Sequence, residues 1–558
     1  MTSSRISSSH TAPSFAELFT PKLITVFREG YGWPDLRADA VSGLTVAVVA
    51  LPLSMAIAIA SGVSPERGLY TAIAGGLIIS LIGGSRFQIG GPAGAFIGLV
   101  AGVVERHGYE GLAIATVLAG VILVAVGLLR LGTYVKYIPF PVTVGFTAGI
   151  AVIIFASQLR DLLGLRIVHE PAALLPRLSA IREALPTMHV PTIAIALLSI
   201  AVIALLRKLR PAWPSFLIAV ALAAAVCALF PLDVETVSSR FGVVPRSLPS
   251  PALPAFSLEK VSTLLPDAIA IALLGAIESL LSAVVADGMT GRRHRSNCEL
   301  SAQGVGNIVS VLFGGICVTG TVARTATNVR AGARGPVSGI FHCGYLLLFL
   351  VVFAPLVGFI PLAALAAVLV VVAWNMAEKE EFWSLLRSSR GDAAVLLATF
   401  LLTIFVDLVT GIAVGVVLGA LLFLHRMAEA VEVDGGRASL EDVADETDRD
   451  RYDAAQATNR DVIVYRISGA FFFGATARVL TVLERLGATP RTFVLDFEDV
   501  PLIDSTAAHS LVTFVNKLNR SGTEVVFAGT RPPVRRTLNR AGLKPPLVRF
   551  AATSAIGT

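Results

Sequence analysis

The chain has 558 residues, of which 54% are hydrophobic and only 15% are charged, and its mean hydropathy is +0.75. Because an ordinary soluble domain carries roughly 25% charged residues, this composition excludes a soluble enzyme, a secreted disulfide scaffold and a disordered chain. The net charge of +6 does not indicate nucleic-acid binding, since membrane proteins carry excess Lys and Arg in their cytoplasmic loops.

Apolar runs of membrane-spanning length follow one another from residue 39 to residue 426. A helix needs about 20 apolar residues to cross the bilayer. Breaks at Gly, Pro and charge clusters predict helices at 39–60, 69–84, 112–130, 141–158, 190–207, 213–230, 264–286, 301–313, 336–354, 360–375, 392–406 and 409–426. With the two shorter apolar pieces 92–103 and 321–331, the total is about fourteen segments. The predicted inner loops hold more Lys and Arg than the outer ones, which places both residues 1–38 and the tail in the cytoplasm.

The two short pieces occupy corresponding places in the two halves of this region. Each follows a Gly-Gly pair, and they open with the sequences GGPAG (90–94) and VTGT (318–321). Such pairs of interrupted segments mark the binding site of many transporters, because a half-helix that starts in mid-bilayer points free N–H groups at an anion. The predicted substrate-binding residues at these starts are Ala93, Gly94, Ala95, Thr321, Val322 and Ala323. The alternative is Gly-rich packing between helices.

Ionisable residues inside the membrane are candidates for function. Glu278 lies within an apolar run, and Ser282 follows one helical turn later. We expect this pair to be the site of a coupling proton or Na⁺, although Glu278 as a structural partner of an Arg is the alternative. Arg324 lies near the start of the second half-helix. It is predicted to bind the anion, and the alternatives are a salt bridge to Glu278 or a side chain that extends to the membrane interface. Pro52 is expected to break or kink the first helix, which makes Ser54 a candidate for the pocket wall.

Other reactive residue types give no sign of a metal or cofactor site. The four cysteines are scattered, without CxxC or Cys/His spacing: Cys227, Cys298, Cys317 and Cys343. We therefore expect no metal, no cofactor and no disulfide. His342 is interpreted as a packing residue, and Asp407 as a loop or helix-cap residue rather than a ligand.

The tail after residue 427 has a soluble composition. Acidic residues dominate 427–460, which predicts a solvated linker. Beyond it, strands at 462–467, 493–497 and 524–528 alternate with helices at 476–486, 505–518 and 534–541, which indicates a small α/β domain over 461–558. Ser505 is predicted to cap the second of these helices, where a phosphate group would also be well placed, so Ser505 is a candidate phosphorylation site.

Four stretches of the chain resemble the SulP anion transporters, also called solute carrier family 26. The stretches DAVSGLTVAVVALP (39–52), NCELSAQGVGN (297–307) and TGTVARTATN (319–328) look like the family's first segment, its link between the eighth and ninth, and its tenth segment. The tail resembles a STAS domain, the fold of anti-sigma-factor antagonists. This resemblance covers nearly the whole chain after about residue 35.

The resemblance implies an inverted repeat of seven plus seven segments, arranged as a core and a gate domain. It also implies anion binding between the third and tenth segments, elevator-like movement of the core and a homodimer. Family substrates include sulfate, bicarbonate, chloride and dicarboxylates. Glu278 matches a family carboxylate that is Asp in sodium-coupled bicarbonate members. The Glu in this chain therefore favours a proton over Na⁺ as the coupling ion. Many members have Gln where this chain has Leu53, so one polar contact of the binding pocket is missing. In the tail, Ser505 matches the serine that is phosphorylated in bacterial anti-sigma-factor antagonists.

Together these features predict a polytopic α-helical membrane protein with a transport domain over 39–426 and a cytoplasmic STAS domain. The leading hypothesis is a secondary active transporter of small anions in the cell inner membrane, not an enzyme. The expected substrate is sulfate, with bicarbonate or a C4-dicarboxylate as the next candidates. Transport is expected to be coupled to protons. The alternatives are an uncoupled anion channel, a Na⁺-coupled bicarbonate symporter, a signalling protein whose STAS domain binds a cytoplasmic partner, and a nucleobase transporter of similar architecture.

Overall fold

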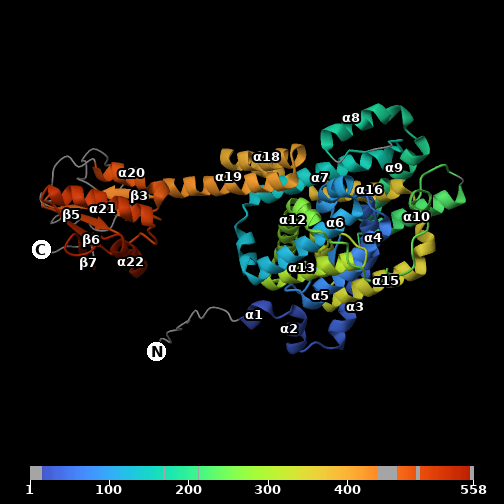
Figure 1. Ribbon diagram of the computed structural model, residues 1–558, viewed down its shortest axis with the longest axis horizontal. Helices are drawn as coiled ribbons and strands as arrows, with labels where there is room; N and C mark the ends of the chain where they lie inside the picture. The colour runs from blue at the N-terminus through green and yellow to red at the C-terminus, as the bar shows by residue number, and fades with distance from the viewer. Residues whose placement is uncertain are drawn as a thin grey trace. The chain divides into compact units, whose positions relative to one another are not determined.

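The computed structural model describes residues 15–167, 170–171, 173–211, 213–230, 232–435, 462–484 and 490–552. The chain forms two compact units, Met1–Val416 and Val417–Thr558, and Figure 1 labels their helices and strands. Among the described residues, eight helical stretches are long and apolar enough to cross a membrane. The predicted membrane-embedded region is therefore helical, with a separate α/β unit after it.

In the first unit, one set of helices packs together and is called here the first bundle. Its members are α3 (Trp33–Ala60), the continuous run α4 (Pro65–Tyr70), η1 (Thr71–Gly75) and α5 (Gly76–Ile82), η2 (Gly94–Phe96) with α6 (Ile97–Leu128), α12 (Leu258–Thr290), α13 (Ser296–Leu312), α14 (Val322–Arg330) and α15 (Val337–Val357). Glycines allow a close crossing of α13 and α6: a Cβ added at Gly304 of α13 would lie 2.4 Å from the carbonyl oxygen of Gly120 in α6.

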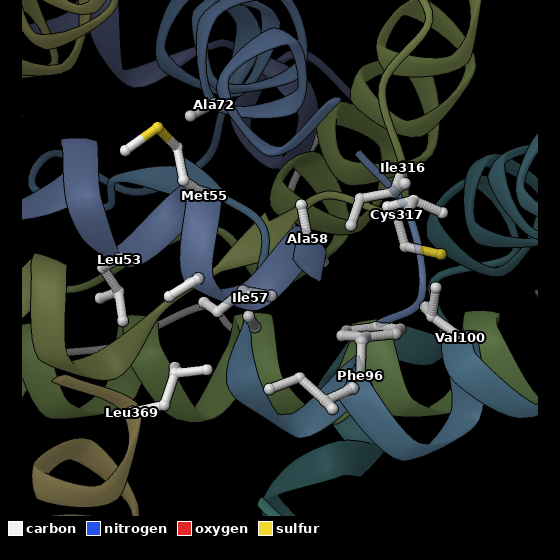
Figure 2. Close-up of a cluster of buried hydrophobic side chains, with 14 of the residues drawn as sticks. Leu53, Met55, Ile57, Ala58, Ala72, Phe96, Val100, Ile316, Cys317 and Leu369 are labelled. Atoms are coloured by element: carbon white, nitrogen blue, oxygen red, sulfur yellow. The ribbon is translucent and has the colours of Figure 1, made fainter. Parts of the chain in front are cut away.

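A second set, called here the second bundle, consists of α7 (Phe140–Leu163), α9 (Val190–Leu209), α10 (Ser215–Leu229), α16 (Leu362–Met376), α17 (Lys379–Ser388), α18 (Arg390–Phe405) and the start of α19 (Leu408–Glu429). Short elements complete the unit: α1 (Phe15–Phe19), α2 (Lys22–Arg28), η3 (Leu131–Tyr137), α8 (Leu174–Ala184), η4 (Leu185–Thr187) and α11 (Val237–Phe241). The bundles meet where α10 and α16 pack against α3. Figure 2 shows this apolar contact, with Leu369 of α16 beside Leu53 and Ile57 of α3.

Two expectations about the helices are corrected. The helix α3 continues through Pro52 from Trp33 to Ala60, so of the expected break or kink the break is not observed, and the kink stays a prediction. The buried apolar side chains around Pro52 hold the chain helical although one backbone donor is lost. The half-helix predicted at 92–103 is longer, because the backbone leaves helical geometry only at Gly108, with φ 66° and ψ −175°. Asp407 does cap a helix, as expected, since it accepts a hydrogen bond of 2.8 Å from the amide of Thr410 at the start of α19.

The second unit contains a five-stranded sheet in the order β3-β4-β5-β6-β7. Its strands are β3 (Glu432–Gly435), β4 (Val462–Ser468), β5 (Thr492–Asp496), β6 (Glu524–Ala528) and β7 (Arg549–Ala551), and its helices are α20 (Phe473–Glu484), α21 (Ser505–Arg520) and α22 (Pro532–Arg540). Strand β3 pairs antiparallel with β4, and the remaining neighbours are parallel. Apolar side chains from both layers form its core, and they include Phe493, Phe497 and Phe527.

Two predictions for this unit need correction. Residues 432–435 were expected in a solvated acidic linker, but they form the edge strand β3. Acidic residues alternate there with Val431 and Val433, which pack against the core of the unit, so the local period is that of a strand. The remainder of the predicted linker, from residue 436, lies outside the described residues. The cap of α21 is Asp504, not Ser505: its carboxylate accepts a hydrogen bond of 2.8 Å from the amide of Ala507, and Ser505 is the exposed first residue of the helix.

Candidate anion-binding site

The starts of the two half-helices lie next to each other because the short strands before them pair. Strand β1 (Gly90–Gly91) runs antiparallel to β2 (Thr319–Gly320), with Gly90 opposite Gly320. Shortly after these strands, Ala93 occupies the N-cap position of η2 and Thr321 that of α14, and neither makes a side-chain capping hydrogen bond. The first N–H groups of a helix have no partner within it, and each helix start carries about half a positive charge. Two such ends side by side make an electropositive spot without an ionised side chain.

Arg324 adds a full charge to this spot. Its side chain is 1% exposed, and Nη2 donates hydrogen bonds to Ser54 Oγ at 3.3 Å and to the carbonyl oxygen of Pro92 at 3.0 Å. The Nε and Nη1 atoms have no hydrogen-bond partner among the described residues. A buried guanidinium with unused donors is suited to holding an oxyanion, because it presents several N–H groups in a planar fork.

The predicted substrate-binding residues therefore come together in one place. Ser54 of α3, Ala93 and Ala95 are buried around the strand pair, and Thr321 is buried at the start of α14. By contrast, Gly94 and Val322 are half-buried and Ala323 is exposed. The first turns of η2 and α14 are consequently the open side of the site, and Arg324 forms its interior.

The strands β1 and β2 can be covered by neighbouring side chains only because each has a glycine, which carries no Cβ, at the point of contact. A Cβ at Gly91 would lie 1.8 Å from Arg324 Nη1, and one at Gly320 would lie 1.5 Å from Gln88 Nε2. Gln88 also donates a hydrogen bond of 2.8 Å to Ser279 Oγ on α12. One polar side chain therefore lies over each strand of the pair, and each requires a glycine beneath it.

Glu278 of α12 is 8% exposed and makes no hydrogen bond or ion pair within the described part of the chain. The predicted alternative of a salt bridge to Arg324 is not observed, since the guanidinium faces Ser54 and Pro92. One turn later, Ser282 is fully buried and donates a hydrogen bond of 3.0 Å to Thr325 Oγ1 of α14. Of the two predicted coupling residues, Ser282 therefore contacts the helix that carries Arg324, and the carboxylate of Glu278 has no compensating charge among the described residues.

The comparisons with known proteins agree with this arrangement. The sequence profile of the sulfate permease family matches residues 36–399, and that of the STAS domain matches residues 454–555. The chain belongs to the sulfate permease family. This is a family of transporters and not of enzymes. The anion transporter expected from the sequence resemblance is therefore confirmed at the level of the family.

Relatives within the sulfate permease family cover almost the whole chain. It is 40% identical over 517 residues to the "Putative sulfate transporter YvdB" of Bacillus subtilis. The matched region covers 92% of this chain and 95% of the relative. It is 30% identical to the bicarbonate transporter BicA of Picosynechococcus, over 91% of each chain. The solved transmembrane domain of a cyanobacterial BicA is 31% identical, with a TM-score of 0.62 over 68% of this chain and 98% of that one. The structure of SLC26A9 shares the fold, with a TM-score of 0.79 at 18% identity over 93% of this chain and 88% of that one.

Several residues that shape the candidate site were not singled out from the sequence. Asn307 of α13 fixes the strand before α14: its Nδ2 donates to the carbonyl oxygen of Val318, and its Oδ1 accepts from the amide of Val318. Asn328 donates a hydrogen bond of 2.9 Å to the carbonyl oxygen of Phe87. Gln88, two residues before the Gly90-Gly91 pair, was detectable as a polar residue between the apolar residues Phe87 and Ile89. The two asparagines act on backbone that is farther away in the sequence.

Proposed function

We propose that this protein is a secondary active transporter of small oxyanions, with sulfate as the first candidate and bicarbonate or a C4-dicarboxylate as the next. The observation that carries the proposal is the fully buried guanidinium of Arg324, with two donor atoms unused, beside two converging helix starts. A divalent oxyanion accepts hydrogen bonds from such donors in every direction. The names of the relatives YvdB and BicA, which refer to sulfate and bicarbonate, support the same substrate class.

In the proposed mechanism, Glu278 carries the coupling proton. An uncompensated carboxylate buried in the membrane favours its neutral form, so protonation removes a charge from the first bundle as the anion adds charge. The loaded first bundle then moves against the second bundle in an elevator-like manner. Glycine-lined crossings inside the first bundle, such as that of Gly120 with Gly304, allow it to move as one body.

The architecture proposed with this mechanism follows the sequence expectation. It comprises about fourteen membrane segments in a seven-plus-seven inverted repeat over 39–426, and a cytoplasmic STAS domain over 461–558. The protein is proposed to lie in the inner membrane as a homodimer. Ser505, exposed at the start of α21, remains the proposed site of phosphorylation, and a cytoplasmic protein is the proposed partner of the STAS domain.

A Na⁺-coupled transporter is the second candidate. The hydroxyl oxygens of Ser282 and Thr325 lie 3.0 Å apart, one turn beyond Glu278. Carboxylate and hydroxyl oxygens are the ligands that a hard cation prefers. This combination supports Na⁺ as an occupant of the coupling site in place of the proton.

Uptake by proteoliposomes tests both candidates. The purified full-length protein would be loaded into vesicles and given radiolabelled sulfate, bicarbonate or succinate under a pH gradient, a Na⁺ gradient or neither. We expect saturable sulfate uptake driven by external acid, and its loss in Glu278→Gln. The matched control is Glu259→Gln, an exposed carboxylate on the same helix. Uptake driven only by Na⁺ would favour the second candidate, and non-saturable conductance without counterflow would contradict both in favour of a channel.

A further inference from the structure

Helices α1 and α2 precede the first long helix α3 and lie at one end of the first bundle (Figure 1). Contacts other than the covalent link to α3 fix them there. Arg295, directly before α13, donates hydrogen bonds of 2.8 Å from Nη1 to the carbonyl oxygen of Thr20 and to Thr25 Oγ1. The amide of Lys22 donates a hydrogen bond of 2.9 Å to the carbonyl oxygen of Gly83, directly after α5. The two helices are therefore docked on the bundle.

The other face of α2 exposes large apolar side chains. Val26 belongs to the docked face: it is 5% exposed, and its Cγ1 lies 3.1 Å from the Cβ position of Gly335 in the turn before α15. By contrast, Ile24 is 42% exposed and Phe27 is 56% exposed. Trp33, which begins α3, is 76% exposed. Large apolar side chains grouped in this way indicate contact with a partner less polar than water.

Ring and hydroxyl contacts place this face at the level where the apolar run of α3 begins. The ring of Phe27 packs edge-on against that of Tyr31, with 5.3 Å between the centroids, and the Tyr31 hydroxyl donates a hydrogen bond of 2.7 Å to Asp39 of α3. The run that follows Asp39 is long and apolar enough to cross a membrane, and it exposes Val41 and Leu44. Phe27 therefore lies beside the boundary between the polar start of α3 and the part of α3 that is suited to lipid.

Arginines flank the apolar side chains on both sides of α2. The segment before α13 contacts the helix pair through Arg295, and the turn between α14 and α15 contacts α2 through Gly335. The exposed arginines of these two segments and of α2 and α3 are Arg28, Arg37, Arg292, Arg293, Arg330 and Arg334. The exposed carboxylates among the described residues of α1, α2 and these segments are Glu17 and Glu29, and Glu29 is paired with Arg86. The exposed charge of this surface is therefore positive.

We propose that this surface, made of Ile24, Phe27, Trp33 and the six exposed arginines, binds the anionic phospholipids of the adjacent membrane leaflet. The apolar side chains enter the upper acyl region and the guanidinium groups bind the phosphates, as in helices that lie in the plane of a membrane. Guanidinium groups match phosphate oxygens in a bidentate manner, and Trp side chains favour the boundary between lipid and water. Because α1 and α2 are docked on the first bundle, the contact attaches that bundle to the leaflet. The inference goes beyond the proposed transport function and does not depend on it.

Contact quenching in bilayers tests the inference. The full-length protein carries Cys227→Ser, which removes the one cysteine of the four that is not buried, and a fluorescent label at Phe27→Cys, and it is reconstituted in nanodiscs. A nitroxide on the upper acyl chain of phosphatidylcholine quenches the label only where lipid touches it. We expect quenching at Phe27→Cys and also at Ile24→Cys, which keeps the test valid if one substitution disturbs α2. Val41→Cys on α3 is the lipid-exposed control, and Ser521→Cys, exposed in the C-terminal unit, is the water-exposed control.

The charge of the bound lipid is tested with the same label. At equal molar shares, nitroxide-bearing phosphatidylglycerol should quench Phe27→Cys about two- to fivefold more strongly than nitroxide-bearing phosphatidylcholine, because each arginine attracts an anionic headgroup. Arg293→Gln combined with Arg330→Gln removes one arginine on each side of α2 and should make the two lipids quench equally. Arg520→Gln, an exposed arginine of the C-terminal unit, is the matched control and should leave the ratio unchanged.

Labels at Phe27→Cys and Ile24→Cys that lipid does not quench, while Val41→Cys is quenched, would overturn the inference. The face would then be covered by the C-terminal unit, by a second copy of the chain or by water. Equal quenching by the two lipids before any arginine is replaced would overturn the role of the arginines. Neither measurement involves sulfate uptake, so failure of the proposed transport function leaves this test intact.

Discussion

The guanidinium of Arg324 lies against the bare backbone of Gly91, where the Cβ of any other residue would come within 1.8 Å of Nη1. The cation of the candidate anion site therefore depends on the absence of a side chain on the paired strand. This relationship connects the two halves of the transport region, because Gly91 precedes the first half-helix and Arg324 lies in the second.

Gly91→Ala should displace Arg324 while leaving the fold intact. The added methyl group cannot share the space with Nη1, so the guanidinium must shift away from Ser54 and Pro92. We expect the KM for sulfate uptake to rise by about tenfold, a typical result of overpacking at a site that requires a fixed geometry. Gly102→Ala is the control, since a Cβ at Gly102 meets nothing within 4 Å. Equal KM values in the two variants would show that the position of Arg324 is unimportant for binding.

Arg324→Lys should weaken anion binding although the charge is kept. A lysine supplies one compact ammonium group instead of the planar fork that reaches Ser54 and Pro92 and leaves Nε and Nη1 free. Loss of one or two charge-assisted hydrogen bonds predicts a decrease in affinity of about 10- to 100-fold, measurable by calorimetric titration with sulfate. Arg330→Lys, an exposed position on the same helix, should bind as the parent does. Unchanged affinity in Arg324→Lys would limit the role of this residue to its charge.

Asp39→Ala should destabilise the first bundle strongly. The carboxylate of Asp39 accepts hydrogen bonds from Tyr31 Oη at 2.7 Å and from the amides of Arg334 and Gly335 at 2.6 and 3.1 Å. Burial, and then the contact with Asp39, raises the pKa of the Tyr31 hydroxyl, which therefore remains a donor at alkaline pH. Leaving these amides without an acceptor should lower the free energy of unfolding by about 2–4 kcal/mol, seen as a lower Tm in detergent.

The matched control for Asp39 is Asp35→Ala on the same helix. Asp35 accepts one exposed hydrogen bond of 3.0 Å from the amide of Gly32 at the helix start. Its removal should cost about 1 kcal/mol, the usual value for a helix cap. Equal changes in Tm for the two variants would be inconsistent with a buried anchor at Asp39.

Asp504→Ala should loosen the start of α21 in the C-terminal unit. Its carboxylate accepts hydrogen bonds from the amides of Ala507 at 2.8 Å and Phe473 at 3.0 Å, so it joins two helix starts. We expect a loss of about 1–2 kcal/mol and faster hydrogen exchange at those two amides in the full-length protein. Ser505→Ala, at the adjacent exposed position, should leave exchange unchanged. The opposite order would restore Ser505 as the cap.

The membrane segments were largely predictable because their signal is local. Runs of apolar residues bounded by Gly, Pro and charges gave helices close to those observed, for example 213–230 against Ser215–Leu229 and 321–331 against Val322–Arg330. The break at Gly108 lies between the predicted segments 92–103 and 112–130, and only the length of the first of these was underestimated. In the C-terminal unit, β3 was missed because an acidic composition concealed its alternating valines.

The site was predictable in part for the same reason. Gly90–Gly94 and Val318–Thr321 are sequence signals for interrupted helices, and Arg324 and Glu278 stand out as charges in apolar surroundings. The orientation of the Arg324 side chain was left open between anion binding and a salt bridge, because a side chain of that length reaches several partners.

The sequence by itself determined that the chain is a helical membrane protein with an α/β tail, and it marked the places where helices are interrupted, because hydropathy and backbone preference act within a few residues. Only the tertiary structure decided that β1 pairs with β2, that Arg324 faces Gly91 and not Glu278, and that Ser282 of α12 bonds to Thr325 of α14. Those relationships join residues far apart in the chain. They depend on how rigid helices pack against one another, which no short stretch of sequence encodes.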